Sequence, residues 1–202
     1  MQQLILDIAP AAEPDFDNFL PGPNAEALER VRALARGELR EAIVYLWGNP
    51  GSGRSHLLRA ALKADARLVA ADDVETLDGA AQQRLFVAIN AAREGAAPVL
   101  AAGSRPPAQL ELREDLRTRL AWGLVYQLRP LSDEEKAAHL RAEAARRGLR
   151  LPEEVLGYLL GRLPRDLPSL KAVLEALDRY SLAAKRPVTL PLLREALERK
   201  NR

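Results

Sequence analysis

The sequence contains no cysteine, which excludes disulfides, cysteine-based zinc sites and a thiol nucleophile. Its two histidines, His56 and His139, are too few and too far apart in the chain to indicate a metal site. Aromatic residues make up only 4% of a chain that is 48% hydrophobic, so we expect an aliphatic core and much helix. The sequence shows neither an apolar run of membrane-spanning length nor a secretion signal. We therefore expect a soluble, cytoplasmic protein with no membrane partner.

The chain also lacks a marked excess of either sign of charge. The chain has 30 basic and 28 acidic residues, for a net charge of +2. This balance is unlike that of a dedicated nucleic-acid surface, although a pI of about 9.1 leaves room for a local basic patch. We expect no sequence-specific DNA binding from charge alone. A length of 202 residues suits one α/β domain with a small helical appendage.

A segment at residues 47–58 that contains a glycine-rich turn stands between an apolar run at residues 42–46 and helix-forming residues 59–63. Strand, glycine-rich turn and helix occur in the order of a phosphate-binding P-loop. Gly51 and Gly53 can adopt positive φ and lack a Cβ, so the backbone N–H groups between Gly48 and Ser55 can converge on a phosphate chain. The helix N-terminus adds further donors and positive charge. The alternative is an ordinary Gly/Pro surface turn.

The P-loop motif departs from the usual pattern at one position. Arg54 stands where the motif has lysine, and Ser55 supplies the hydroxyl that holds Mg²⁺. A planar guanidinium does not fit the phosphate cradle as a slender ammonium does. We therefore expect ADP or ATP with Mg²⁺, ADP favoured, and weak or absent intrinsic hydrolysis. The candidate nucleotide-binding residues here are Gly48, Gly51, Gly53, Arg54, Ser55 and His56.

Polar residues follow two further apolar stretches. Asp72 and Asp73 end the stretch at residues 67–73, and Ser104 follows the stretch at residues 99–102. An acidic residue at such a strand end is the Walker B group, which anchors Mg²⁺ through water, and we assign this role to Asp72 before Asp73. The alternative is a turn with an aspartate helix cap, because Asp78 and Gly79 lie close by. The short gap after the P-loop helix predicts a parallel sheet reduced by one strand.

Helical patterns flank this α/β region. Asn24 is a candidate N-cap for a helix at residues 25–36. From residue 131 onward the pattern predicts four helices, which form a C-terminal lid. We expect three parts: an N-terminal peptide and linker at residues 1–14, an α/β base at 15–130 and the lid at 131–202.

The first residues are apolar and precede a proline-containing linker. By residue type alone, an edge strand is the more ordinary interpretation. The functional alternative is a short linear motif, in which Gln3 supplies hydrogen bonds while Leu4 and Leu6 fill a partner's pocket.

The order of these parts resembles the AAA+ ATPases, and within them the DnaA group, most closely its Hda family of regulators. On this resemblance Phe16, Asn18 and Phe19 frame the adenine, Ser104 is the sensor 1 position and Arg119 is an arginine finger that acts in trans. Gln3, Leu4 and Leu6 then match the family's clamp-binding peptide. One departure is Pro168, which stands where sensor 2 usually has arginine, with Arg165 nearby as a candidate substitute.

The resemblance implies a regulatory adaptor that binds the DNA polymerase III sliding clamp and promotes hydrolysis of DnaA-bound ATP, limiting re-initiation of replication. DnaA and the clamp are the implied partners, and a homo-oligomer is plausible because an arginine finger acts across an interface. The alternatives are a self-sufficient AAA+ ATPase, such as a helicase loader, and a DnaA-like DNA-binding initiation factor. The chain ends at Arg202 without the DNA-reading domain of DnaA, which disfavours the last.

Overall fold

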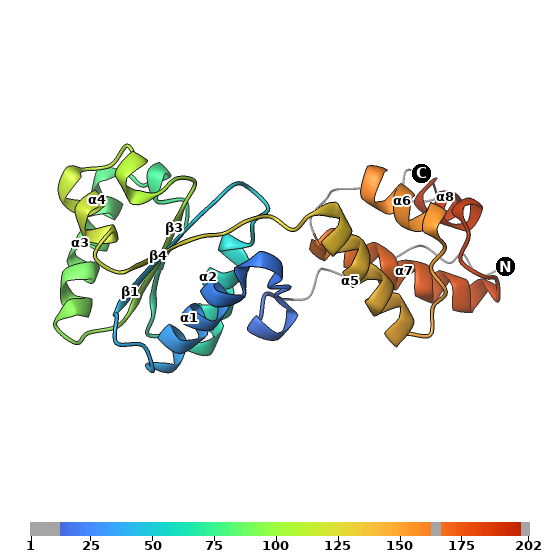
Figure 1. Cartoon of the computed structure of the whole chain (residues 1–202), viewed down its shortest axis with the longest axis horizontal. Coiled ribbons are helices and arrows are strands. Elements are labelled where there is room, and N and C mark those ends of the chain that lie inside the picture. Colours follow the sequence, from blue (N-terminus) through green and yellow to red (C-terminus); the bar gives the residue numbers. More distant parts are fainter. Residues whose placement is uncertain (1–12, 163–166, 199–202) are drawn as a thin grey trace. The chain divides into compact units, whose positions relative to one another are not determined.

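The computed structural model describes residues 13–162 and 167–198. The chain divides into two compact units, which are described separately below. One is the base, Pro14–Leu131, and the other includes the lid, which begins at Ser132 (Figure 1).

The base is built on a parallel sheet in the order β2-β3-β1-β4. The strands are β1 (Ile43–Trp47), β2 (Val69–Ala71), β3 (Val99–Gly103) and β4 (Leu124–Gln127). β1 pairs with β3 and β4, and β2 pairs with β3, all in parallel. The predicted parallel sheet is confirmed, and its four strands in the described part of the base agree with a sheet reduced by one strand. All strand carboxyl ends therefore lie along one edge.

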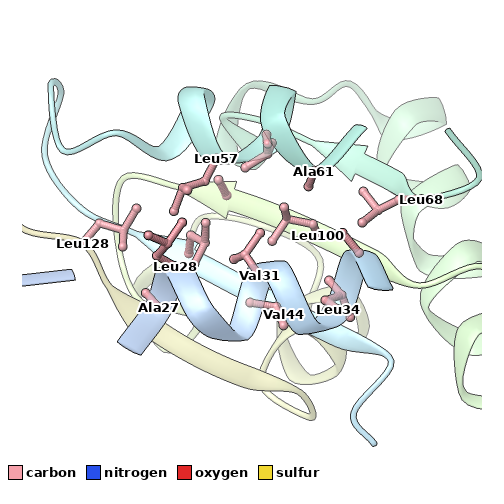
Figure 2. Close-up of a cluster of buried hydrophobic side chains, with 14 residues drawn as sticks. Ala27, Leu28, Val31, Leu34, Val44, Leu57, Ala61, Leu68, Leu100 and Leu128 are labelled. Carbon is pink, nitrogen blue, oxygen red and sulfur yellow. The ribbon is translucent and has the colours of Figure 1, made fainter. Parts of the chain in front are cut away.

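Helices cover both faces of the sheet (Figure 1). Helices α1 (Ala25–Arg36) and α2 (Arg54–Ala64) pack on one face against buried side chains such as Val44 and Leu100 (Figure 2). Helices α3 (Gly79–Arg93) and α4 (Glu114–Leu120) cover the other face, where Tyr45 and Ala101 are buried. Because both faces are covered, the central strands β1 and β3 are almost entirely apolar.

Short 3₁₀ turns connect these elements: η1 (Phe16–Asn18), η2 (Gly22–Asn24), η3 (Val74–Thr76) and η4 (Pro107–Gln109). Asn24 occupies the predicted N-cap position of α1, but it does not cap the helix with its side chain. Instead the buried amide donates to the Arg129 carbonyl and accepts from the Arg129 N–H, both at 2.8 Å. The amide thereby pairs the N–H and the carbonyl of Arg129, two residues beyond β4.

The lid consists of α5 (Asp133–Arg146), α6 (Glu153–Arg162), α7 (Leu167–Ala184) and α8 (Leu190–Glu198), as predicted. Ser132 and Glu135 form a capping box at the start of α5. The helices enclose an aliphatic core that includes Leu140, Leu159 and Leu174. Of the helices in the described residues, none has both the length and the apolar character needed to cross a membrane.

The lid contains a histidine in a position that opposes protonation. The Nε2 atom of His139 is buried and has no hydrogen-bond partner among the described residues. Burial lowers the pKa of His139 below its ordinary value of 6.5, and the positive charge of Lys171 lowers it further, against the opposing effect of Glu143.

We predict that the lid loses stability as the pH falls through about 6.5, because the unfolded chain then binds a proton that the folded lid excludes. Replacing His139 with glutamine removes this titration and should flatten the decline between about pH 7.5 and 5.5. Urea unfolding followed across this range measures the difference. Identical pH profiles for the two proteins would show that His139 does not contribute.

Candidate phosphate-binding site at the P-loop

The P-loop joins the carboxyl end of β1 to the N-terminus of α2. Gly51 and Gly53 adopt the predicted positive φ, at 81° and 98°. The first intrahelical bond of α2 runs from the Leu57 N–H to the Gly53 carbonyl at 3.1 Å. The N–H groups of Arg54 and Ser55 precede it, so the helix itself gives them no acceptor. Gly48 lies against the residue that follows β4, where a Cβ would clash with the Leu128 carbonyl oxygen.

Two buried polar atoms in this loop lack a partner within the described part of the chain. They are Oγ of Ser52 and Nη1 of Arg54. A buried group of this kind normally has a partner, so each indicates a ligand that completes the site. Together with the glycines, these donors fit a phosphate-bearing group.

Asp72 and Asp73 follow β2, next to β3 in the sheet, but they make different contacts. The carboxylate of Asp73 accepts a hydrogen bond from Nη2 of Arg54 at 3.0 Å, and the Arg54 side chain is only 10% exposed. The carboxylate of Asp72 accepts the N–H of Asp73, also at 3.0 Å. Thus Asp73 contacts the P-loop arginine directly, whereas Asp72 hydrogen-bonds the backbone of its neighbour. The Walker B role of Asp72 stays a prediction.

Glu75 also belongs to this site, although the sequence did not indicate it. Its Oε1 accepts the N–H of Ser104 at 2.9 Å, which joins the turn after β2 to the end of β3. Its Oε2 is buried without a partner among the described residues. Burial alone would raise the pKa of Glu75, but the Ser104 hydrogen bond and the Arg54 charge outweigh it and lower the pKa. The carboxylate is therefore held ionised.

Tyr45 anchors the loop that follows β3. It is completely buried on β1, and its hydroxyl donates to the Arg105 carbonyl at 2.8 Å, just beyond β3. Burial and the negative charge of Glu75 both raise the pKa of Tyr45. A phenol among apolar residues in a strand looks like core, so only the structure shows that its hydroxyl fixes the loop carrying Ser104.

The segment predicted to frame the adenine lies beside the P-loop. Phe19 packs so closely that a Cβ on Gly53 would approach its ring within 2.6 Å, and its centroid lies 5.3 Å from that of His56. Nε2 of His56 lies 2.9 Å from the Asp15 carbonyl oxygen. The Asn18 side chain accepts the Asp15 N–H as part of a capping box. Phe16 lies further out, 5.7 Å from the Arg32 guanidinium.

Arg119 is held apart from these residues, on the side of the base formed by α3 and α4. Its guanidinium lies 4.0 Å from the centre of the Phe86 ring and 4.9 Å from that of Trp122. Its Nε donates to Asn90 at 2.8 Å and its Nη1 to the Asp115 carbonyl at 3.2 Å. It lines an open depression of the surface with Asn90, Arg93 and Glu94.

Other predicted residues have less structural support. In the described residues, no group of three or more acidic or histidine side chains is arranged to hold a metal. Ser55, half-buried in the first turn of α2, and Asp72 remain candidates for Mg²⁺ held through water. Gln3, Leu4, Leu6 and Arg165 lie outside the described residues.

Comparison with a family model identifies the lid. Residues 133–197 match the model of the lid domain of Hda. This match covers the four lid helices and does not extend into the base.

Comparison with solved structures identifies the fold of the chain. Domain III of the replication initiation protein DnaA from Thermotoga maritima has a TM-score of 0.70 at 22% identity, over 93% of this chain and 96% of that one. AMPPCP-bound DnaA from Aquifex aeolicus has a TM-score of 0.65 at 20% identity, over 82% and 65%. The RuvB Holliday junction branch migration motor of T. maritima has a TM-score of 0.58 at 16% identity, over 92% and 71%. The predicted resemblance is confirmed: the fold is that of the DnaA-related AAA+ proteins, and the lid is of the Hda type.

The close contact between Gly53 and Phe19 generates a stability prediction. Gly53→Ala should destabilise the base more than Gly95→Ala, although both glycines have a similar positive φ, 98° and 93°. Each alanine incurs about 1–2 kcal/mol of backbone strain. Only at Gly53 does the new Cβ also displace the Phe19 ring, since nothing lies within 4 Å of a Cβ at Gly95. Urea unfolding of both variants measures the difference, and equal losses would contradict the described packing.

Proposed function

We propose that this chain, whose fold and lid place it with the DnaA-related AAA+ proteins, is a regulatory adaptor. In this proposal it binds the DNA polymerase III sliding clamp and promotes hydrolysis of the ATP bound to DnaA. Its action limits re-initiation of replication. The Hda-type lid and the separation of Arg119 from the chain's own P-loop residues support this function.

Nucleotide binding is the first part of the proposal. Ser52 and Arg54 offer unpartnered buried groups at the P-loop, and solved DnaA structures with this fold hold AMPPCP. Gly48, Gly51, Gly53 and the first turn of α2 would surround the phosphates, while Phe19 and His56 would lie toward the base. Mg²⁺, when bound, neutralises phosphate charge, and Ser55 and Asp72 are the residues that would hold it.

An arginine finger is the second part of the proposal, and the position of the Arg119 side chain is the observation that carries it. All the contacts described for the Arg119 guanidinium come from α3, α4 and Trp122, two residues beyond the end of α4. A guanidinium held by Asn90 and an aromatic pair keeps little rotamer freedom to lose when it meets a phosphate. Arg119 is thus prepared to stabilise charge in a nucleotide bound by another protein, DnaA or a second copy of the chain.

A self-sufficient ATPase remains the alternative, because Asp72, Asp73 and Glu75 place carboxylates where a catalytic base could act. This alternative requires ATP turnover by the purified chain alone. The adaptor requires DnaA for turnover. A sequence-specific, salt-dependent affinity for duplex DNA would instead favour an initiation factor.

Replacing Arg119 with alanine should abolish measurable stimulation of DnaA ATP hydrolysis. The loss should be about a thousandfold or more, because an arginine finger contributes that much to the rate. Clamp binding should be unchanged. Arg117→Ala, on the same helix, is the matched control and should retain stimulation. The measurement is single-turnover hydrolysis of DnaA-bound ATP with clamp loaded on DNA. Full activity of the Arg119 variant would contradict its role.

Clamp binding is tested at the N-terminal peptide. A Gln3→Ala/Leu4→Ala double variant should lose retention on immobilised sliding clamp, because the hydrogen bonds and one apolar anchor are removed. Gln2→Ala is the control for a neighbouring glutamine and should still bind. If the double variant binds as well as the wild type, with or without ADP, these residues are not the clamp-binding site.

A further inference from the structure

The Arg54 guanidinium has one edge occupied and one edge unpaired. Nη2 is bound to Asp73 at 3.0 Å, whereas Nη1 is buried with no partner in the described part of the chain. A guanidinium presents its N–H donors in a rigid planar fork, so it can bind two anions at once only through different edges. An anion that reached Nη1 would therefore leave the pair between Arg54 and Asp73 in place.

Two carboxylates lie near Arg54. Asp73 pairs with its guanidinium, and Glu75 is close enough for the Arg54 charge to lower its pKa. The basic residue at this position of a P-loop normally reaches the β- and γ-phosphates together. Here a third phosphate would need the edge that Asp73 occupies, and it would meet the charge of nearby carboxylates.

We infer that Asp73 is a specificity-determining residue that makes the P-loop favour a nucleoside diphosphate over the triphosphate. With a diphosphate, Nη1 of Arg54 binds the terminal phosphate and the pair with Asp73 persists. With a triphosphate, that pair has to break or the γ-phosphate remains unpaired. This inference rests on the proposed nucleotide binding and assigns to one carboxylate the selectivity of that site.

Asparagine is a suitable replacement at this position. Asp73 has a φ of 44°, in the left-handed region, which asparagine tolerates better than most residues do. Asp73→Asn thus removes the charge while keeping the turn. Asp65→Asn is the matched control, because it removes the charge from another Asp–Arg pair, with Arg67, at the opposite end of α2.

The experiment measures dissociation constants for ADP and ATP by titration calorimetry, with Mg²⁺ and again with EDTA. The ratio of the ATP to the ADP constant should fall about fivefold in Asp73→Asn, the size expected for removal of a partly exposed ion pair. The ratio should be unchanged in Asp65→Asn. The change should persist in EDTA, since charge repulsion does not require the metal, whereas loss of a metal contact would weaken ATP binding only with Mg²⁺.

The outcomes separate the inference from the proposed function. If both nucleotides bind Asp73→Asn with an unchanged ratio, the inference is wrong but nucleotide binding stands. An equal change in Asp65→Asn would attribute the effect to general charge and would also overturn it. If the wild type binds neither nucleotide, the nucleotide-binding part of the proposed function fails, and the inference fails with it.

Discussion

The parallel pairing of the four strands is the constraint on which the site depends. Because β1, β2, β3 and β4 run in one direction, their carboxyl ends lie along one edge of the sheet. That edge receives the P-loop from β1, the carboxylates after β2 and Ser104 after β3. Residues as far apart in the chain as Tyr45 and Arg105, 60 positions, thereby become neighbours.

Hydrogen bonds then couple these strand ends to one another. Tyr45 fixes the loop after β3 through the Arg105 carbonyl, and Glu75 holds the Ser104 N–H. Asp73 holds one side of Arg54. A ligand that engages Arg54 therefore acts on a connected set of groups, and buried polar networks of this kind respond to the loss of one partner more strongly than single pairs do.

The sequence allowed the fold class, the glycine conformations of the P-loop and the lid helices to be predicted, because each depends on local periodicity or turn chemistry. The prediction from sequence failed where a side chain hydrogen-bonds the backbone of a residue far away in the chain. The amide of Asn24 binds the backbone of Arg129 rather than capping α1, and Glu75 reaches Ser104 from an unremarkable turn. Tertiary structure determines such pairings, and the spacing of residues in the sequence does not predict them. The contact of Asp73 rather than Asp72 with Arg54 has the same origin.

The proposed adaptor directs the hydrolysis of a nucleotide held by DnaA. The most direct test loads DnaA with labelled ATP, removes unbound label, and adds the purified chain with excess unlabelled ADP and clamp on DNA. We predict conversion of the DnaA-bound label to ADP at a rate set by the added chain, with no ATP turnover by the chain alone. Unchanged label on DnaA, together with ATP turnover by the isolated chain, would contradict the adaptor and identify a self-sufficient ATPase.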